Sequence, residues 1–234
     1  MSAKKTDIAN IREIAKAFLY LEPEVNPDIP LFIEHPYFTN RVIMTKENDL
    51  VDFIEHPEAL DRVREEIIKQ IDEGDLITMF CLMQDKYHLA FLKHIKQYMS
   101  KRDFTKRLAE AWIGSENPNQ DNNVSINELI RWFKQTDRNF LMSKEEREYF
   151  DSLPEIVEIY RGVAVGRAEQ KGLSWTCNHD TAKWFSERFN RGEEKGYILK
   201  GKIHKEDIFA YFNGRNEDEI CCDSSKVFDV SKEQ

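Results

Sequence analysis

The pattern of apolar residues changes at Pro154, and this change constrains the fold more than any other feature of the 234-residue chain. Before Pro154, apolar residues recur at helical spacing, for example at Ile8, Ile11, Ala15, Phe18 and Leu19. After it, short runs rich in β-branched and aromatic residues predict strands at 156–160, 173–176, 197–203 and 227–230. We therefore expect an α+β protein, with a helical N-terminal half followed by a mixed β-sheet core.

The predicted helices have recognisable ends. The first ends at the proline-containing segment 23–30, and the second runs from Pro57 to Gly74, because glycine readily takes the left-handed conformation after a helix. Ser125 with Glu128, and Ser143 with Glu146, have the spacing of capping boxes. Further helices are expected at 75–84, 86–99, 104–113, 126–136, 144–152 and, capped by Asp180, at 181–189.

The length allows one large domain or two small ones. A polar stretch at 114–123 is rich in turn formers and is a candidate domain boundary or lid loop. We assign residues 1–102 to a helical region of unknown role. Residues 103–234 form a second predicted domain, with helices in 103–152 and a strand-rich core in 153–234.

Composition excludes several classes of protein. The first residues lack the apolar stretch of a secretory signal, and no run of about 18 apolar residues could span a membrane, so we expect a cytoplasmic protein. Cys81 and Cys177 stand alone while Cys221 and Cys222 are adjacent, which favours reduced thiols; no histidine spacing predicts a metal site. The net charge of −9 makes nucleic acid an unlikely partner, because phosphate backbones are repelled.

Three clusters in the strand-rich region contain residues suited to chemistry. They are Tyr160-Arg161-Gly162, Ser174-Trp175-Thr176 and Glu217-Asp218-Glu219. Each alone is an ordinary strand end, strand or acidic turn, but their order is informative. It resembles the Arg-Ser-Glu class of mono-ADP-ribosyltransferases, which have an arginine on the first strand, a Ser-x-Ser or Ser-x-Thr strand followed by a helix, and a Glu-x-Glu loop. The resemblance covers residues 160–230 and implies that 103–234 is the catalytic domain.

The resemblance also implies a role for each residue, with NAD as co-substrate. Arg161, with Gly162 beside it, would hold the NAD pyrophosphate, since a guanidinium presents paired donors to phosphate oxygens. Glu219 would be the central catalytic carboxylate, stabilising the oxocarbenium-like state at the nicotinamide ribose. Ser174 would hydrogen-bond this carboxylate and contact NAD, and Thr176 would shape the same strand.

The acceptor side of the reaction involves other residues. Glu217 lies on the same side as Glu219 if the segment is extended, and the resemblance then implies arginine as the acceptor side chain. Arg191 occupies the place of a loop that contacts NAD, although a solvated charged turn explains it equally well. Tyr211 and Phe212 would suit contact with a protein substrate if exposed, and would otherwise belong to the core.

We therefore expect an enzyme that transfers ADP-ribose from NAD to an arginine of a protein and releases nicotinamide. Two alternatives stay open. One is an NAD glycohydrolase, in which water replaces the acceptor. The other is a catalytically silent binding or inhibitory module, against which the intact Arg161, Ser174 and Glu219 count. The resemblance favours a phage or bacterial effector, and the helical first part is a candidate site for docking a partner.

Overall fold

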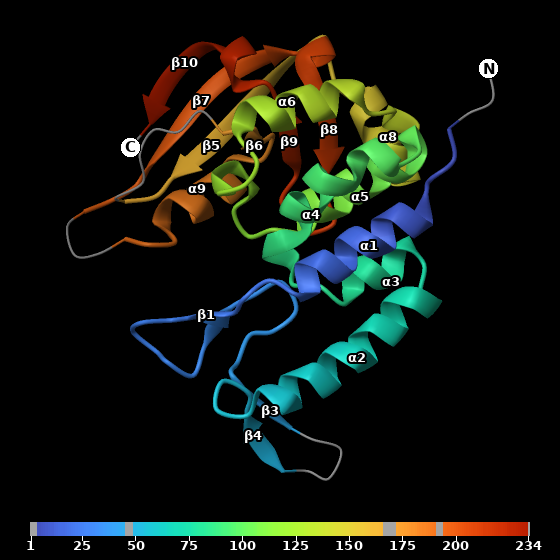
Figure 1. Ribbon diagram of the computed structural model, residues 1–234. Coiled ribbons are helices and arrows are strands. Elements are labelled where there is room, and N and C mark those ends of the chain that lie inside the picture. Colours follow the sequence, from blue (N-terminus) through green and yellow to red (C-terminus); the bar gives the residue numbers. More distant parts are fainter. Residues whose placement is uncertain (1–3, 45–48, 166–171, 191–193, 234) are drawn as a thin grey trace. The chain divides into compact units, whose positions relative to one another are not determined.

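The computed structural model describes residues 4–44, 49–165, 172–190 and 194–233. The chain forms two compact units, Met1–Asp103 and Phe104–Gln234, and each is described by itself (Figure 1). Within the described ranges the protein combines nine α-helices with a six-stranded antiparallel sheet. None of these helices combines the length and the apolar character needed to cross a bilayer.

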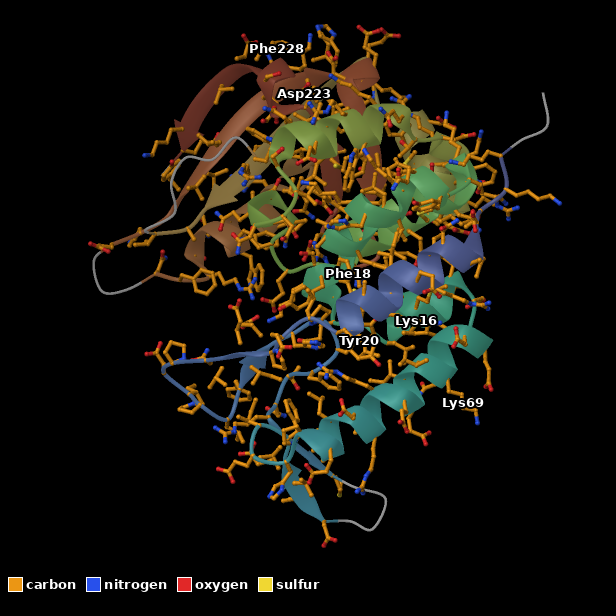
Figure 2. The ribbon with its side chains drawn as sticks, viewed as in Figure 1. Lys16, Phe18, Tyr20, Lys69, Asp223 and Phe228 are labelled. Carbon is orange, nitrogen blue, oxygen red and sulfur yellow. The ribbon has the colours of Figure 1, made fainter. Side chains whose placement is uncertain are left out.

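The first unit is built around helix α1, Ile8–Leu19. Its apolar side, Ile11, Ala15 and Leu19, is fully buried, and the helix packs against α2, α3 and α4. At the edges of this packing, Lys16 Nζ lies 2.7 Å from a carboxylate oxygen of Asp72 on α2, and the Phe18 ring meets Phe91 of α4 edge-on. Figure 2 labels Lys16 and Phe18 on α1. The other helical elements of this unit are α2 (Pro57–Glu73), α3 (Leu76–Cys81), η1 (Asp85–Tyr87), α4 (His88–Ile95) and η2 (Lys96–Tyr98).

The sequence predicted a helical first region, but the first unit also contains strands. Two small antiparallel hairpins lie between α1 and α2, formed by β1 (Glu24–Val25) with β2 (Ile33–Glu34), and by β3 (Val42–Met44) with β4 (Leu50–Asp52). Strands of two or three residues are too short to show the alternation that reveals a strand in sequence. The prediction for Gly74 was also wrong, since its φ of −82° and ψ of 165° are extended. Glycine is needed there because a Cβ would lie 2.6 Å from the Gln70 carbonyl oxygen.

The second unit contains the large sheet, whose strand order is β10-β7-β5-β6-β9-β8 (Figure 1). Every neighbouring pair is antiparallel, so the predicted mixed sheet was wrong. The last two strands in this order were not predicted; they flank the acidic cluster and pair with each other as a hairpin. The strands are β5 (Ile156–Val163), β6 (Ser174–Thr176), β7 (Tyr197–His204), β8 (Ile208–Phe212), β9 (Glu219–Cys222) and β10 (Phe228–Glu233).

Helices precede and interrupt this sheet. Both predicted capping boxes form, at the starts of α6 and α8, whereas α9 is capped by Asn178 and not by Asp180. Helices α7 and α8 pack on β8, and α9 packs on β5, β6 and β7. The helical elements are α5 (Lys101–Gly114), η3 (Pro118–Gln120), α6 (Ile126–Gln135), α7 (Arg138–Leu141), α8 (Lys144–Ser152), α9 (His179–Glu187), η4 (Lys205–Asp207) and η5 (Ser224–Lys226).

Strand pairing brings the three sequence clusters together. On β6, Thr176 is opposite both Tyr160 of β5 and Glu219 of β9. Adjacent strands in a sheet lie about 5 Å apart. The sheet thus places parts of the chain that are far apart in sequence at neighbouring positions, and a cavity lies beside them.

Candidate active site

A cavity of about 270 Å³ opens in the second unit where β5, β6 and the start of β9 meet. The segment 116–120 forms one wall, and residues at the end of α9 form another. Six residues predicted to act in the site line it, namely Arg161, Gly162, Ser174, Thr176, Glu217 and Glu219. The fold therefore brings these residues, which are far apart in sequence, to one cavity.

Glu219 is buried at the inner side of the cavity, with 5% of its surface exposed. Its Oε1 accepts two hydrogen bonds, from Ser174 Oγ at 2.6 Å and from Trp112 Nε1 at 3.0 Å. Burial raises the pKa of Glu219 above that of an ordinary glutamate, while these two hydrogen bonds and the charge of Arg215 act in the opposite direction. With Oε1 held by two donors, Oε2 is the oxygen left to meet a ligand.

Ser174 is itself positioned by Asn119, a residue that the sequence did not single out. Asn119 Nδ2 donates to Ser174 Oγ at 3.2 Å, while Asn119 Oδ1 accepts the Leu173 backbone N–H at 2.6 Å. Because the serine oxygen accepts from Asn119, its own hydrogen is directed to Glu219. The chain of contacts from Asn119 through Ser174 fixes both the position of the carboxylate and the direction of the hydrogen bond.

The segment that carries Asn119 was predicted to be a domain boundary or a lid. The boundary interpretation was wrong, since residues 114–123 lie inside the second unit. Its turn formers build the 3₁₀ helix η3, and residues 116–120 face the cavity. A polar stretch between helices is compatible with a linker and with a wall of a binding site, and only tertiary contacts distinguish the two.

Arg161 brings a positive charge to the cavity. Its Nη1 donates to the Ser174 carbonyl oxygen, and among the described residues no carboxylate forms an ion pair with it. Burial lowers the pKa of this guanidinium, which stays charged near neutral pH as arginine does in proteins. A partly desolvated cation without a carboxylate partner is suited to an anionic ligand.

Two glycines allow this arrangement. A Cβ on Gly172 would lie 2.6 Å from Arg161 Nη2 and 2.9 Å from Asn119 Cγ, so only glycine leaves room for both side chains. A Cβ on Gly162 would lie 2.1 Å from the Ala182 carbonyl oxygen, so α9 packs directly against the backbone of β5. Gly162 lines the cavity, and the packing of the neighbouring helix also requires a glycine there.

The acidic cluster adopts a turn before β9, so the condition under which Glu217 and Glu219 would share a side by strand alternation is not met. Asn216 and Asp218 have positive φ values of 56° and 47°, a region that asparagine and aspartate enter more readily than most residues. Thr176 Oγ1 donates to the Glu217 carbonyl oxygen at 2.8 Å, and Tyr211 Oη donates to Asp218 at 2.6 Å. Glu217 and Glu219 reach the same cavity through this turn and not through strand alternation.

Glu217 already has a partner in this turn. Arg215 Nε and Nη2 lie 3.1 and 2.9 Å from Glu217 Oε2, and Nη2 lies 4.0 Å from Glu219 Oε2. Arg215 Nη1 donates to the Ile113 carbonyl oxygen at 2.9 Å. A cation therefore lies beside the two carboxylates and reduces their mutual repulsion.

The prediction that Tyr211 and Phe212 contact a protein substrate was wrong. They are 3% and 2% exposed, because β8 is covered by α7 and α8, and the Tyr149 ring of α8 stacks on Tyr211 at 4.2 Å. Alternation could not reveal this, since all five residues of β8 are buried. Arg191 lies outside the described residues.

Three residues of the site gave no recognisable signal in the sequence. Trp112 falls in a predicted helix and Asn119 in a polar stretch, while Arg215 precedes the acidic cluster. Each acts through a hydrogen bond or ion pair to a residue distant in sequence or across a turn. Over the described part of the chain, no group of three or more His, Cys, Asp or Glu side chains could hold a metal ion.

Comparisons with known proteins found no relative of this chain. No model of a protein family, no curated protein and no solved structure matches the chain.

Proposed function

We propose that the protein is an NAD-dependent mono-ADP-ribosyltransferase that modifies arginine side chains of proteins and releases nicotinamide. One observation carries the proposal. Ser174 donates to the buried carboxylate of Glu219 in the same cavity to which Arg161 brings its charge. These three residues stand in the order of the Arg-Ser-Glu class and lie 13 and 45 positions apart in sequence.

The cavity offers groups suited to the parts of NAD. Arg161 supplies paired N–H donors and a charge for the pyrophosphate. Tyr160, Phe185 and Phe189 supply aromatic surface for the flat rings of nicotinamide or adenine. The combination of the Arg161 charge with aromatic walls favours a nucleotide over a simple anion.

Glu219 would act on the ribose that carries nicotinamide. Breaking the bond between C1′ and the nicotinamide nitrogen leaves positive charge on the sugar, and a fixed carboxylate stabilises that charge. Ser174 and Trp112 hold Oε1, so Oε2 is free to accept a hydrogen bond from a ribose hydroxyl. Desolvation strengthens this electrostatic effect, since the carboxylate is buried.

Glu217 would bind the acceptor. Its carboxylate pairs with a guanidinium in the structure, which is the interaction an arginine acceptor requires. In the transfer step the guanidine nitrogen forms a bond to C1′, neutral nicotinamide leaves with the electron pair of the broken bond, and the guanidinium proton passes to Glu217. The products are ADP-ribosyl-arginine, nicotinamide and a proton.

A second function, NAD glycohydrolysis, has one observation in its favour. Glu217 is occupied by Arg215, so an external arginine must displace an existing ion pair whereas water need not. The same carboxylate, Glu219, would stabilise the sugar in both reactions. The acceptor used by the purified protein distinguishes them.

The test is to incubate the purified chain with labelled NAD, with and without a small guanidine acceptor such as agmatine, and to follow nicotinamide and labelled product. Glu219→Ala should abolish both signals. Glu217→Gln should retain nicotinamide release and lose agmatine modification. Glu158→Gln is the matched control, because this glutamate lies on β5 outside the cavity and pairs with Lys200.

Three outcomes would contradict the proposal in different ways. If the rate of nicotinamide release is the same with and without agmatine and the only labelled product is free ADP-ribose, the protein is an NAD glycohydrolase. Loss of both signals in Glu217→Gln would contradict the division of roles between the two carboxylates. No signal from the wild-type chain would remove the enzyme hypothesis.

A further inference from the structure

Arg215 lies where an arginine acceptor would have to lie. Its Nε and Nη2 approach the same oxygen of Glu217, at 3.1 and 2.9 Å, which is the contact expected of an acceptor guanidinium. Its Nη2 is 4.0 Å from Glu219 Oε2, the oxygen that has no donor from Ser174 or Trp112. The guanidinium is therefore adjacent to both the acceptor-binding and the ribose-stabilising carboxylates.

The orientation of Arg215 is fixed by the chain itself. Nη1 donates to the Ile113 carbonyl oxygen at the end of α5, which directs Nη2 toward the carboxylates. The turn that carries it is held by Thr176 on the Glu217 carbonyl oxygen and by Tyr211 on the Asp218 carboxylate. An acceptor held in this way needs no encounter with a second molecule, and a positioned nucleophile gains greatly over a free one.

Other arginines at the cavity lack these contacts. Arg161 donates to the Ser174 carbonyl oxygen. Arg188 stacks over Trp184 and Phe189, at 5.3 and 5.2 Å from their ring centres. Among the arginines that line the cavity in the described residues, Arg215 is the one paired with Glu217.

We propose that Arg215 is an internal acceptor and becomes ADP-ribosylated in cis, an inference that rests on the proposed function. Glu217 accepts a proton from the Arg215 guanidinium, and Nη2 forms a bond to C1′ of the nicotinamide ribose. The bond between C1′ and nicotinamide breaks, and nicotinamide leaves neutral with that electron pair. NAD is the only co-reactant and the step involves no change of oxidation state. Reacting atoms must come within about 3 to 3.5 Å of each other. Arg215 Nη2 lies 4.0 Å from Glu219 Oε2, the oxygen proposed to bind the ribose, so the nucleophile is on the same side of the cavity as that sugar.

The experiment maps modified residues on the full-length protein. The wild-type chain is incubated with NAD and no added acceptor, digested with a protease that does not cut at arginine, and analysed by mass spectrometry. ADP-ribose is expected on Arg215 and not on Arg161 or Arg188. The modified fraction at a given time should not depend on protein concentration, because the reaction is intramolecular.

Two variants complete the test. In a mixture of wild-type chain with a tagged Glu219→Gln chain, Arg215 of the tagged chain should stay unmodified. In Arg215→Lys the proposed acceptor guanidinium is absent, so the label bound to the chain, divided by the nicotinamide released, should fall at least about tenfold. A tenfold fall corresponds to a rise of ~1.4 kcal/mol in the activation free energy of transfer to the chain. Dividing by nicotinamide released makes this result independent of any change in the rate of NAD cleavage.

The outcomes separate this inference from the function on which it rests. Agmatine modification with unmodified Arg215 would overturn the inference and leave the transferase proposal intact. Modification of Arg215 on the tagged Glu219→Gln chain would show transfer between molecules and overturn the claim of transfer in cis. Unchanged chain-bound label in Arg215→Lys would place the acceptor elsewhere. Absence of nicotinamide release from the wild-type chain would remove both proposals.

Discussion

Replacing Trp112 by phenylalanine tests whether the indole supports the ionised form of Glu219. Trp112 is fully buried on α5, and its Nε1–H donates to Glu219 Oε1 at 3.0 Å. Phenylalanine keeps an aromatic ring against Phe133, which the indole meets edge-on at 5.3 Å, but supplies no donor. The substitution thus removes one hydrogen bond to a buried carboxylate along with part of the packing.

A double-mutant cycle separates these two losses. A hydrogen bond to a charged group contributes about 1.5–3 kcal/mol, and one between neutral groups about 0.5–1.5 kcal/mol. Trp112→Phe should therefore cost about 1 to 2 kcal/mol more in the wild-type background, where the acceptor is charged, than in Glu219→Gln, where it is a neutral amide. The packing loss is common to both backgrounds and cancels.

This coupling should depend on pH. Burial raises the pKa of Glu219 in the folded protein, so the group takes up its proton at a higher pH than it does in the unfolded chain. As pH falls, the acceptor therefore becomes neutral in folded molecules before an exposed glutamate with an ordinary pKa would. The extra coupling energy should be smaller at the lower pH, because the hydrogen bond is then made to an uncharged group.

The measurement is urea unfolding followed by far-UV circular dichroism, at pH 7.5 and pH 5, for the four members of the cycle. Trp132→Phe combined with Glu219→Gln is the control, because Trp132 is almost as deeply buried and meets Phe104 edge-on at 6.0 Å, whereas the indole that donates to Glu219 is that of Trp112. Its coupling to Glu219 should be zero within about 0.3–0.5 kcal/mol. A Trp112 coupling that is equally small at pH 7.5 would refute the reasoning.

Three further predictions follow from the same contacts. Asn119→Ala should lower the kcat of nicotinamide release about tenfold, because Ser174 Oγ loses the donor that directs its hydrogen to Glu219. A tenfold loss corresponds to ~1.4 kcal/mol of activation free energy. Gly162→Ala should destabilise the fold by about 3 kcal/mol in urea unfolding, since its Cβ would lie 2.1 Å from a carbonyl oxygen of α9, whereas Gly214→Ala, with its nearest atom at 3.9 Å, should be tolerated. Glu219→Gln should raise the urea midpoint at pH 7.5, because ionising a buried carboxylate with a raised pKa costs folding stability. The gain in stability should be smaller at pH 5, where a larger fraction of Glu219 is protonated in the folded protein. An equal gain at pH 7.5 and pH 5 would contradict this prediction.

The local pattern of the sequence was sufficient for many secondary-structure elements. Both capping boxes form because each depends on residues three positions apart, and β5 and β7 include the predicted runs 156–160 and 197–203. The local pattern failed where a strand was too short to alternate or was buried on both faces. The hairpins β1–β2 and β3–β4 are too brief for alternation. Strand β8 is buried throughout, so its sequence could not decide whether Tyr211 and Phe212 lie at the surface or in the core.

The sequence by itself determined which residues are candidates for the proposed chemistry, because Arg161, Ser174 and Glu219 stand in a characteristic order whose members are recognisable one by one. Tertiary structure decided how they are held. Strand pairing puts Thr176 opposite Glu219, and a turn with two positive φ values, not strand alternation, brings Glu217 to the cavity. Trp112, Asn119 and Arg215 entered the site only through hydrogen bonds and ion pairs that close across the folded chain. Such contacts depend on distance in space, and the spacing of residues along the sequence carries no record of them.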